Sequence, residues 1–111
     1  MKVLDVGCGP GSLTVDIAKH VQPGGKVTGV ESVPDPLNEA RKLAEQEGVE
    51  VTFEVADAMQ LPYGDDEFDF VFAHQVLQHV FDPVKMLKEM RRVAKTGSGL
   101  VACRESSVSV S

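Results

Sequence analysis

Three carboxylates stand where apolar segments end: Asp5 near the end of the first, Glu31 closing the second and Asp57 closing the third. A glycine-rich loop, residues 7–11 (GCGPG), follows the first segment. Glycine loses more backbone freedom on folding than other residues, so the cluster predicts that a small ligand lies against the backbone. Negative charge at the strand ends would repel a pyrophosphate and attract a cation. A carboxylate about twenty residues beyond such a loop suits ribose hydroxyls. The residues therefore predict an adenosine-like, positively charged ligand with little or no phosphate.

Two other uses of a glycine-rich loop fit the sequence less well. The dinucleotide fingerprint G-x-G-x-x-G needs a third glycine where this chain has Ser12. A P-loop needs a lysine followed by serine or threonine, and the first lysine beyond the loop is Lys19, well inside the next helix. Phosphate binding is therefore poorly supported.

The elements that position these residues alternate along the chain. Strands are expected at 2–6, 26–31, 49–57, 67–74 and 100–105, and helices from Ser12, from Asp35, over 75–80 and from Pro83 to Lys95. This order predicts an α/β fold: a Rossmann-like, doubly wound, mostly parallel five-stranded sheet of order 3-2-1-4-5 with helices on both faces. In such a sheet a ligand binds beyond the carboxyl ends of the strands, where the glycine-rich loop lies.

Capping and periodicity predict how the helices begin and which faces they bury. Ser12, Asp35 and Asp82 are expected as N-caps. The inward faces are expected to be Leu13, Ile17, Ala18 and Val21, then Leu37, Ala40, Leu43 and Ala44, then Leu87, Met90 and Ala94. The basic residues Lys85, Lys88, Arg91, Arg92 and Lys95 are interpreted as a solvated helix face.

Composition limits the class of protein. The 111 residues suffice for one domain, which we divide into a core (residues 1–105) and a frayed tail (106–111). A formal net charge of -6 argues against nucleic acid as the main partner. No apolar run approaches the ~18 residues of a membrane span. Two cysteines, far apart, form neither a disulfide framework nor a zinc site, so no metal is expected and the cytoplasm is the expected location.

Four motifs in order resemble a known family. The segment "VLDVGCGPG" resembles the first motif of class I S-adenosylmethionine-dependent methyltransferases, and the resemblance continues through "VTGVE", "VAD" and "LPYGDDEFDFVFAHQVLQH". The last stretch resembles the UbiE-like group of small-molecule methyltransferases. The resemblance runs from Val3 to about Arg104, so it covers nearly the whole chain. S-adenosylmethionine carries an ammonium, a sulfonium and a ribose, as the strand-end carboxylates suggest independently.

The resemblance implies a role for each motif residue. Asp5, Gly7, Cys8, Gly9 and Gly11 would hold the methionine portion, Glu31 the ribose, Ser32, Val33, Asp57 and Ala58 the adenine, and the His74 backbone carbonyl the ammonium. Other roles stay open at this point. Asp5 could cap backbone amides, and Glu31 and Asp57 could be solvated strand ends. Cys8 suits packing better than nucleophilic attack, since no base is near it in the motif.

The implied reaction is methyl transfer to a small-molecule acceptor by in-line displacement at the sulfonium carbon. Alignment of the two reactants is then the main requirement, and His79 is a candidate general base.

Family members usually have helices before the first strand and two strands after the fifth. The exposed fifth strand is therefore expected to allow self-association. Two alternatives remain: a truncated domain that binds cofactor or a partner without turnover, and an NAD-dependent oxidoreductase, which the glycine spacing disfavours.

Overall fold

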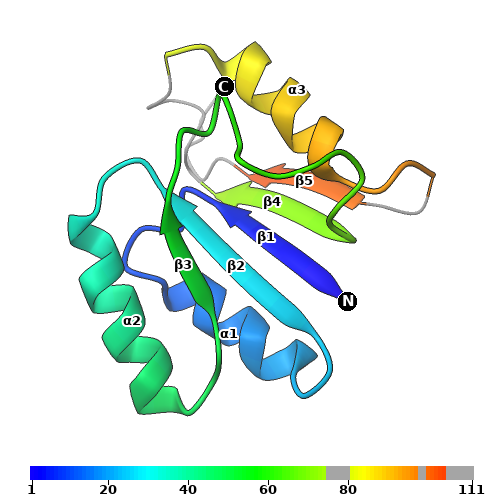
Figure 1. The fold of residues 1–111 in the computed structure, drawn as a ribbon. Coiled ribbons are helices and arrows are strands. Elements are labelled where there is room, and N and C mark those ends of the chain that lie inside the picture. Colours follow the sequence, from blue (N-terminus) through cyan, green and yellow to red (C-terminus); the bar gives the residue numbers. More distant parts are fainter. Residues whose placement is uncertain (75–80, 98–99, 105–111) are drawn as a thin grey trace.

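Five strands form one sheet in the computed structural model, which describes residues 1–74, 81–97 and 100–104. The strands are β1 (Lys2–Val6), β2 (Lys26–Glu31), β3 (Thr52–Val55), β4 (Phe70–His74) and β5 (Leu100–Arg104). Their spatial order is β3-β2-β1-β4-β5, and all four neighbouring pairs are parallel (Figure 1). The predicted sheet and its order are confirmed. All carboxyl ends therefore meet at one edge of the sheet.

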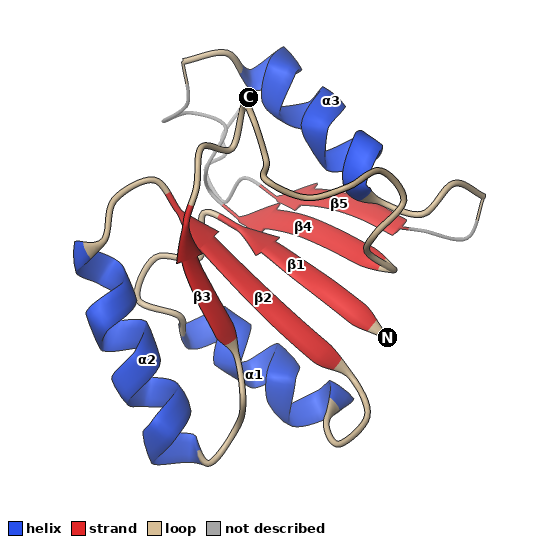
Figure 2. Cartoon of the chain, in the orientation of Figure 1, coloured by secondary structure: helices blue, strands red, loops and turns tan. Residues whose placement is uncertain are grey.

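Helices cover both faces of the sheet, as predicted. Helices α1 (Ser12–Val21) and α2 (Asp35–Glu47) pack on one face, and α3 (Pro83–Val93) packs on the other (Figure 2). Side chains of β1 alternate between the two layers: Leu4 and Val6 belong to the cluster under α3, and Val3 belongs to the cluster under α1. Parallel strands buried on both faces need such continuous apolar runs.

Two strands are shorter than predicted because their flanking residues pair elsewhere. The third was expected over 49–57, but the Val49 amide donates to the Ala44 carbonyl and so completes the end of α2. The fourth was expected over 67–74, but Phe68 forms an isolated bridge with Ala94, after α3. At both sites the apolar side chains are partly or fully buried although their residues lie outside the five-stranded ladder.

Two of the three predicted N-caps are wrong. Gly11, with φ 87°, precedes α1, and Pro34 precedes α2; neither helix start has a side-chain cap. Ser12 and Asp35 are the first residues of their helices. The third prediction is confirmed, because the Asp82 side chain accepts a hydrogen bond from the Lys85 amide.

The inward faces predicted at α1 and α3 are confirmed in part: Ala18, Met90 and Ala94 are buried as predicted, but other positions differ. In α1 the buried residues are Thr14, Val15 and Ala18, and Leu13 is 42% exposed. In α3 the side chain of Met86 is fully buried, and Leu87 is only partly buried. The face of α2 agrees with the prediction except that Leu43 is partly buried. Tertiary contacts at the helix starts, described below, set the rotation of α1.

Two predicted segments, the short helix over 75–80 and the tail 106–111, lie outside the described residues. Among the residues that the structure describes, no helix has the length and apolarity to cross a membrane.

Candidate functional site

The glycine-rich loop is fastened to the carboxyl end of β2. The backbone amides of Gly7 and Cys8 both donate to the Val30 carbonyl, at 2.8 and 2.9 Å. The Gly11 amide donates to the Cys8 carbonyl at 3.1 Å and closes the turn that leads into α1. The loop therefore lies across the ends of β1 and β2, where the sequence predicts the ligand.

Glu31 connects the loop to the second strand through its side chain. Its Oε1 accepts a hydrogen bond from the Gly9 amide at 2.8 Å, and its Oε2 accepts one from the Ser32 amide at 3.1 Å. The Ser32 hydroxyl also donates to Oε2, at 3.5 Å, and since a carboxylate offers about four acceptor positions, one remains for another donor such as a hydroxyl. The predicted ribose carboxylate thus also holds the loop, a role that the sequence alone does not indicate.

Asp5 lies buried behind the loop and is held by a residue that the motif analysis missed. The Thr14 hydroxyl, itself fully buried on α1, donates to Asp5 Oδ2 at 2.5 Å. Burial raises the pKa of Asp5 from its usual 3.8 to about 7, although the Thr14 hydrogen bond lowers it; the charge of Glu31 raises it further. The bond to Asp5 also explains why Thr14, rather than Leu13, faces inward. The sequence does carry a signal for this contact: Thr14 is a polar residue at the third position of a helix that is otherwise apolar on its buried face.

Removing the Thr14 hydroxyl should raise the pKa of Asp5. In Thr14→Val the carboxylate loses the hydrogen bond that favours its ionised form, and the side-chain volume hardly changes. Carbon-detected NMR titration of the Asp5 carboxyl measures the shift. Thr14→Ser keeps a hydroxyl and serves as control. An unchanged pKa in Thr14→Val would mean that the bond does not form in solution.

The raised pKa of Asp5 makes folding stability depend on pH. Between about pH 4 and about pH 7 the unfolded chain ionises Asp5 while the folded chain keeps it protonated. The free energy of unfolding should therefore fall as pH rises through this window, by at most about 4 kcal/mol, and the loss should end above it. The pKa values of Asp69 and Glu89 are lowered in the folded chain, so these two carboxylates have the opposite effect: their contribution to the free energy of unfolding is lost as the pH falls into the acid range. Urea unfolding of wild type and Asp5→Asn as a function of pH isolates the contribution of Asp5. If the free energy of unfolding depends on pH in the same way in both proteins, Asp5 does not cause the effect.

Two glycines of the loop have different reasons to lack a side chain. A Cβ at Gly9 would meet nothing within 4 Å, so this position borders open space. A Cβ at Gly11 would lie 2.7 Å from the Ala40 Cβ on α2, which means that α1 and α2 could not pack as they do. Of these two glycines, Gly9 has the open space that a close approach of a ligand requires. Gly11 serves the packing of the two helices.

Cys8 packs as predicted, and its surroundings disfavour the thiolate that nucleophilic attack requires. Burial, followed by the charges of Asp5 and Glu31, raises the pKa of its thiol to about 12, so the thiol stays protonated. A Cβ on Gly29 of β2 would lie 3.1 Å from both the Cβ and the Sγ of Cys8. The glycine inside "VTGVE" therefore makes room for the loop. A glycine within a strand pattern is the signal for such a close approach.

Asp57 and Ala58 stand on a tight turn after β3. Asp57 Oδ1 accepts from the Met59 amide at 2.9 Å, and the Asp57 carbonyl accepts from the Gln60 amide at 2.9 Å. The Ala56 amide donates to the Glu31 carbonyl at 2.9 Å, which fastens the start of the turn beside the end of β2. Asp57 is exposed, so its carboxylate is accessible to a ligand.

The remaining predicted residues are placed at the same edge of the sheet or outside the described residues. Ser32 and Val33 follow β2 and are exposed, Val33 by 50%. His74 is the last residue of β4, directly beyond Ala73, which pairs with Val6. His79 lies outside the described residues. The structure thus brings the loop, Asp5, Glu31 and the turn at Asp57 to one edge, with His74 at the neighbouring strand end.

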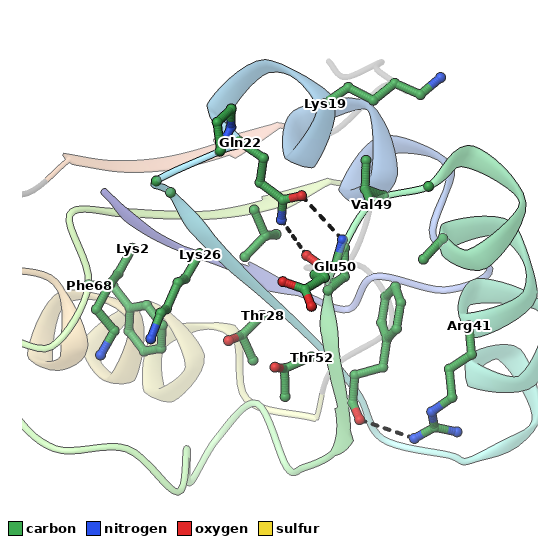
Figure 3. A pocket seen from close by; sticks show the side chains of 18 of the residues that line it. Lys2, Lys19, Gln22, Lys26, Thr28, Arg41, Val49, Glu50, Thr52 and Phe68 are labelled. Carbon is green, nitrogen blue, oxygen red and sulfur yellow. Dashed lines mark hydrogen bonds between the residues drawn. The ribbon is translucent and has the colours of Figure 1, made fainter.

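A cavity of about 1210 Å³ lies elsewhere, toward the amino ends of β1 and β2 (Figure 3). None of the predicted binding residues lines it. Its wall mixes Lys2, Lys26, Thr28 and Thr52 with Glu50, and the Gln22 amide group bridges to the backbone of Glu50 (Figure 3). Although residues of two motifs, such as Thr28 and Tyr63, line it, none of the residues predicted to bind the ligand does, so this cavity is not a candidate for the predicted chemistry. Within residues 1–74, 81–97 and 100–104, no three His, Cys, Asp or Glu side chains are grouped to hold a metal.

Comparison with known proteins places the chain among methyltransferase domains. The profile of the methyltransferase domain family matches residues 1–109. A demethylmenaquinone methyltransferase of Staphylococcus aureus (strain JH9) is 42% identical over 107 residues, which cover 96% of this chain and 43% of that enzyme. The chain spans 34–43% of the length of the first curated relatives it matches.

Solved structures share the fold. A SAM-dependent methyltransferase from Aquifex aeolicus superposes with a TM-score of 0.82 at 30% identity, over 91% of this chain and 55% of that one. The [4+2]-cyclase SpnF superposes with a TM-score of 0.81 at 34% identity, over 90% of this chain and 37% of that one. Because the second protein is described as a cyclase, the fold alone does not determine the reaction.

Proposed function

The chain belongs to the methyltransferase domain family, and from that premise we propose that it binds S-adenosylmethionine at the carboxyl ends of β1, β2 and β3 and transfers the methyl group to a small-molecule acceptor. The observation that carries this proposal is the arrangement of Glu31, Gly9 and Asp5. One carboxylate at the strand end holds a glycine amide that borders open space, and a second carboxyl lies directly behind it.

These residues suit the chemical groups of S-adenosylmethionine. Glu31 has one acceptor position open for a ribose hydroxyl, and release of the 3.5 Å hydrogen bond from the Ser32 hydroxyl would open a second for its vicinal neighbour. Asp5 and Glu31 together provide negative potential for an ammonium and a sulfonium. A bound cation would favour the ionised form of Asp5, so we expect binding near pH 7 to release a proton. Asp57 and Ala58 are the proposed contacts of the adenine.

In the proposed mechanism the main task of the protein is to orient S-adenosylmethionine and the acceptor relative to each other. When bound, S-adenosylmethionine supplies a methyl group on a sulfonium sulfur, which is already a good leaving group. The loop, Glu31 and the Asp57 turn would hold the ligand in one pose, and orientation of this kind lowers barriers by up to about 7–11 kcal/mol. We assign Cys8 no chemical step, since burial and the charges of Asp5 and Glu31 raise the pKa of its thiol. His79 stays a predicted general base.

A second candidate function is cofactor binding without turnover. It stays open because His79, the candidate general base, lies outside the described residues. The cytoplasmic location and self-association through β5 stay predictions of the sequence.

Parallel calorimetric titrations with S-adenosylhomocysteine, S-adenosylmethionine and NAD test the proposal. Binding of the first two without NAD would support the site and exclude the oxidoreductase alternative. Methyl transfer from S-adenosylmethionine to a panel of small acceptors then distinguishes the enzyme from the binding domain. A folded sample that binds none of the three ligands would refute the proposed function for this chain.

A further inference from the structure

The turn that carries Asp57 and Ala58 is held at both ends, and the second attachment comes from α3. At its start the Ala56 amide donates to the Glu31 carbonyl. At its end the Leu61 amide donates to Glu89 Oε1 at 2.8 Å, and the Leu61 carbonyl accepts from Arg92 Nη2 at 3.0 Å. Both backbone groups of one residue are therefore bound by two side chains of the same helix.

Arg92 uses its whole guanidinium in this contact. Its Nη1 donates to the Tyr63 carbonyl and to Asp65 Oδ1, both at 2.8 Å. Its Nε and Nη2 donate to the two oxygens of Glu89, at 2.8 and 3.0 Å. The planar fork of arginine permits this set of bonds and a lysine ammonium does not. The solvated face predicted for the basic run is thus wrong for Arg92.

The contact with α3 fixes the position of Leu61 and, through the turn, that of Asp57. Leu61 is 4% exposed and packs in the cluster under α3, so its position is also set by apolar contacts. The Gln60 and Met59 amides bond back to Asp57, which leaves the turn little freedom between Leu61 and Asp57. A shift of Leu61 is therefore transmitted to the carboxylate of Asp57.

We propose that Arg92 and Glu89 are positioning residues for adenine recognition: they hold the turn 57–60 from α3 so that Asp57 and Ala58 meet the amino edge of the base. This inference rests on the proposed function, because it takes the adenine contacts assigned there. Arg92 and Glu89 touch no ligand atom in this scheme. They determine base specificity through the turn.

The test compares two ligands that differ at the amino edge. S-inosylhomocysteine has an oxygen where S-adenosylhomocysteine has the adenine amino group. Wild type should prefer the adenine ligand by about tenfold or more, as expected when a hydrogen-bonded amino group is lost. Arg92→Lys should reduce this preference to about twofold, because the turn is no longer held by a bidentate fork.

Two further variants make the test specific. Arg91→Lys makes the same chemical change on an exposed neighbour in α3 and should leave the preference intact. Glu89→Gln keeps an acceptor for the Leu61 amide but loses its charge, so it should show a smaller loss of preference. Glu89→Gln also replaces Arg92→Lys in the test if Arg92→Lys does not fold. Thermal unfolding without ligand shows whether each variant is folded.

The possible outcomes distinguish a failure of this inference from a failure of the proposed function. If Arg92→Lys or Glu89→Gln binds both ligands more weakly by the same factor, the two residues have a structural role only and the inference is overturned. If wild type binds both ligands equally, the assignment of adenine to Asp57 is wrong, and this inference fails with it. If wild type binds neither, the proposed function itself is refuted.

Discussion

Glu31→Ala should weaken binding of S-adenosylhomocysteine by on the order of 1–3 kcal/mol, which is about five- to 150-fold in the dissociation constant. The substitution removes the proposed acceptor of two ribose hydroxyls. It also removes the partner of the Gly9 amide at 2.8 Å, so the loop loses one of its attachments to β2. Isothermal titration calorimetry measures the change directly.

Two variants divide this effect into its parts. Glu31→Gln can still accept from the Gly9 amide but lacks the charge, so it should lose part of the affinity and keep the loop in place. Glu39→Ala removes an exposed carboxylate from α2 and should have no effect, which makes it the control for net charge. Hydrogen exchange at the Gly9 amide should quicken in Glu31→Ala alone. Unchanged affinity in Glu31→Ala would exclude Glu31 from the site.

Substitutions at Gly9 and Gly11 should separate binding from folding. Gly9→Val should abolish binding measurable by calorimetry, because its side chain would enter the open space beside the loop. It should cost only about 1–2 kcal/mol of stability, for a left-handed backbone at φ +55°. Gly11→Ala should cost about 2–4 kcal/mol, because strain at φ +87° adds to overpacking against Ala40.

Urea unfolding and calorimetry on both variants test this pair. Gly9→Asn is the control for backbone strain, because asparagine tolerates the left-handed region better than valine. Ala40→Gly should restore part of the stability lost in Gly11→Ala, since it removes the Cβ that the new methyl group would meet. Intact binding in Gly9→Val would place the ligand elsewhere, and a stable Gly11→Ala without rescue would mean that the helix contact is not tight.

Most of the fold could be predicted from local patterns. The strand segments around Val3, Val27 and Val71 are short apolar runs, and a parallel sheet follows from their alternation with helices. Patterns failed where tertiary contacts decide. Leu13 has the right spacing for the buried face of α1, but Gly11 against Ala40 and Thr14 against Asp5 fix a different rotation. Phe68 alternates as in a strand but pairs with Ala94.

The site was predictable as a set of residues and not as a set of contacts. Motif spacing indicates Asp5, Glu31 and Asp57, because strand ends of a parallel sheet share one edge. The contact of Thr14 with Asp5 spans nine residues across the glycine-rich loop, and the contact of Arg92 with Leu61 spans 31 residues. Neither follows from the periodicity of a single helix or strand. In the sequence, Thr14 is visible only as a polar residue within an apolar helix face, and Arg92 only as one basic residue in a run of charged residues.

The central place of β1 has a consequence for biosynthesis. Val3 pairs with Val27 on one side and with Phe70 on the other, so the strand that leaves the ribosome before its partners is the one that they enclose. One edge of β1 stays unpaired until β4 has been translated, which at about 5–20 residues per second takes several seconds. During that interval a nascent chain exposes an apolar strand edge. Protection by a ribosome-associated chaperone is therefore most useful for this fold before translation reaches β4.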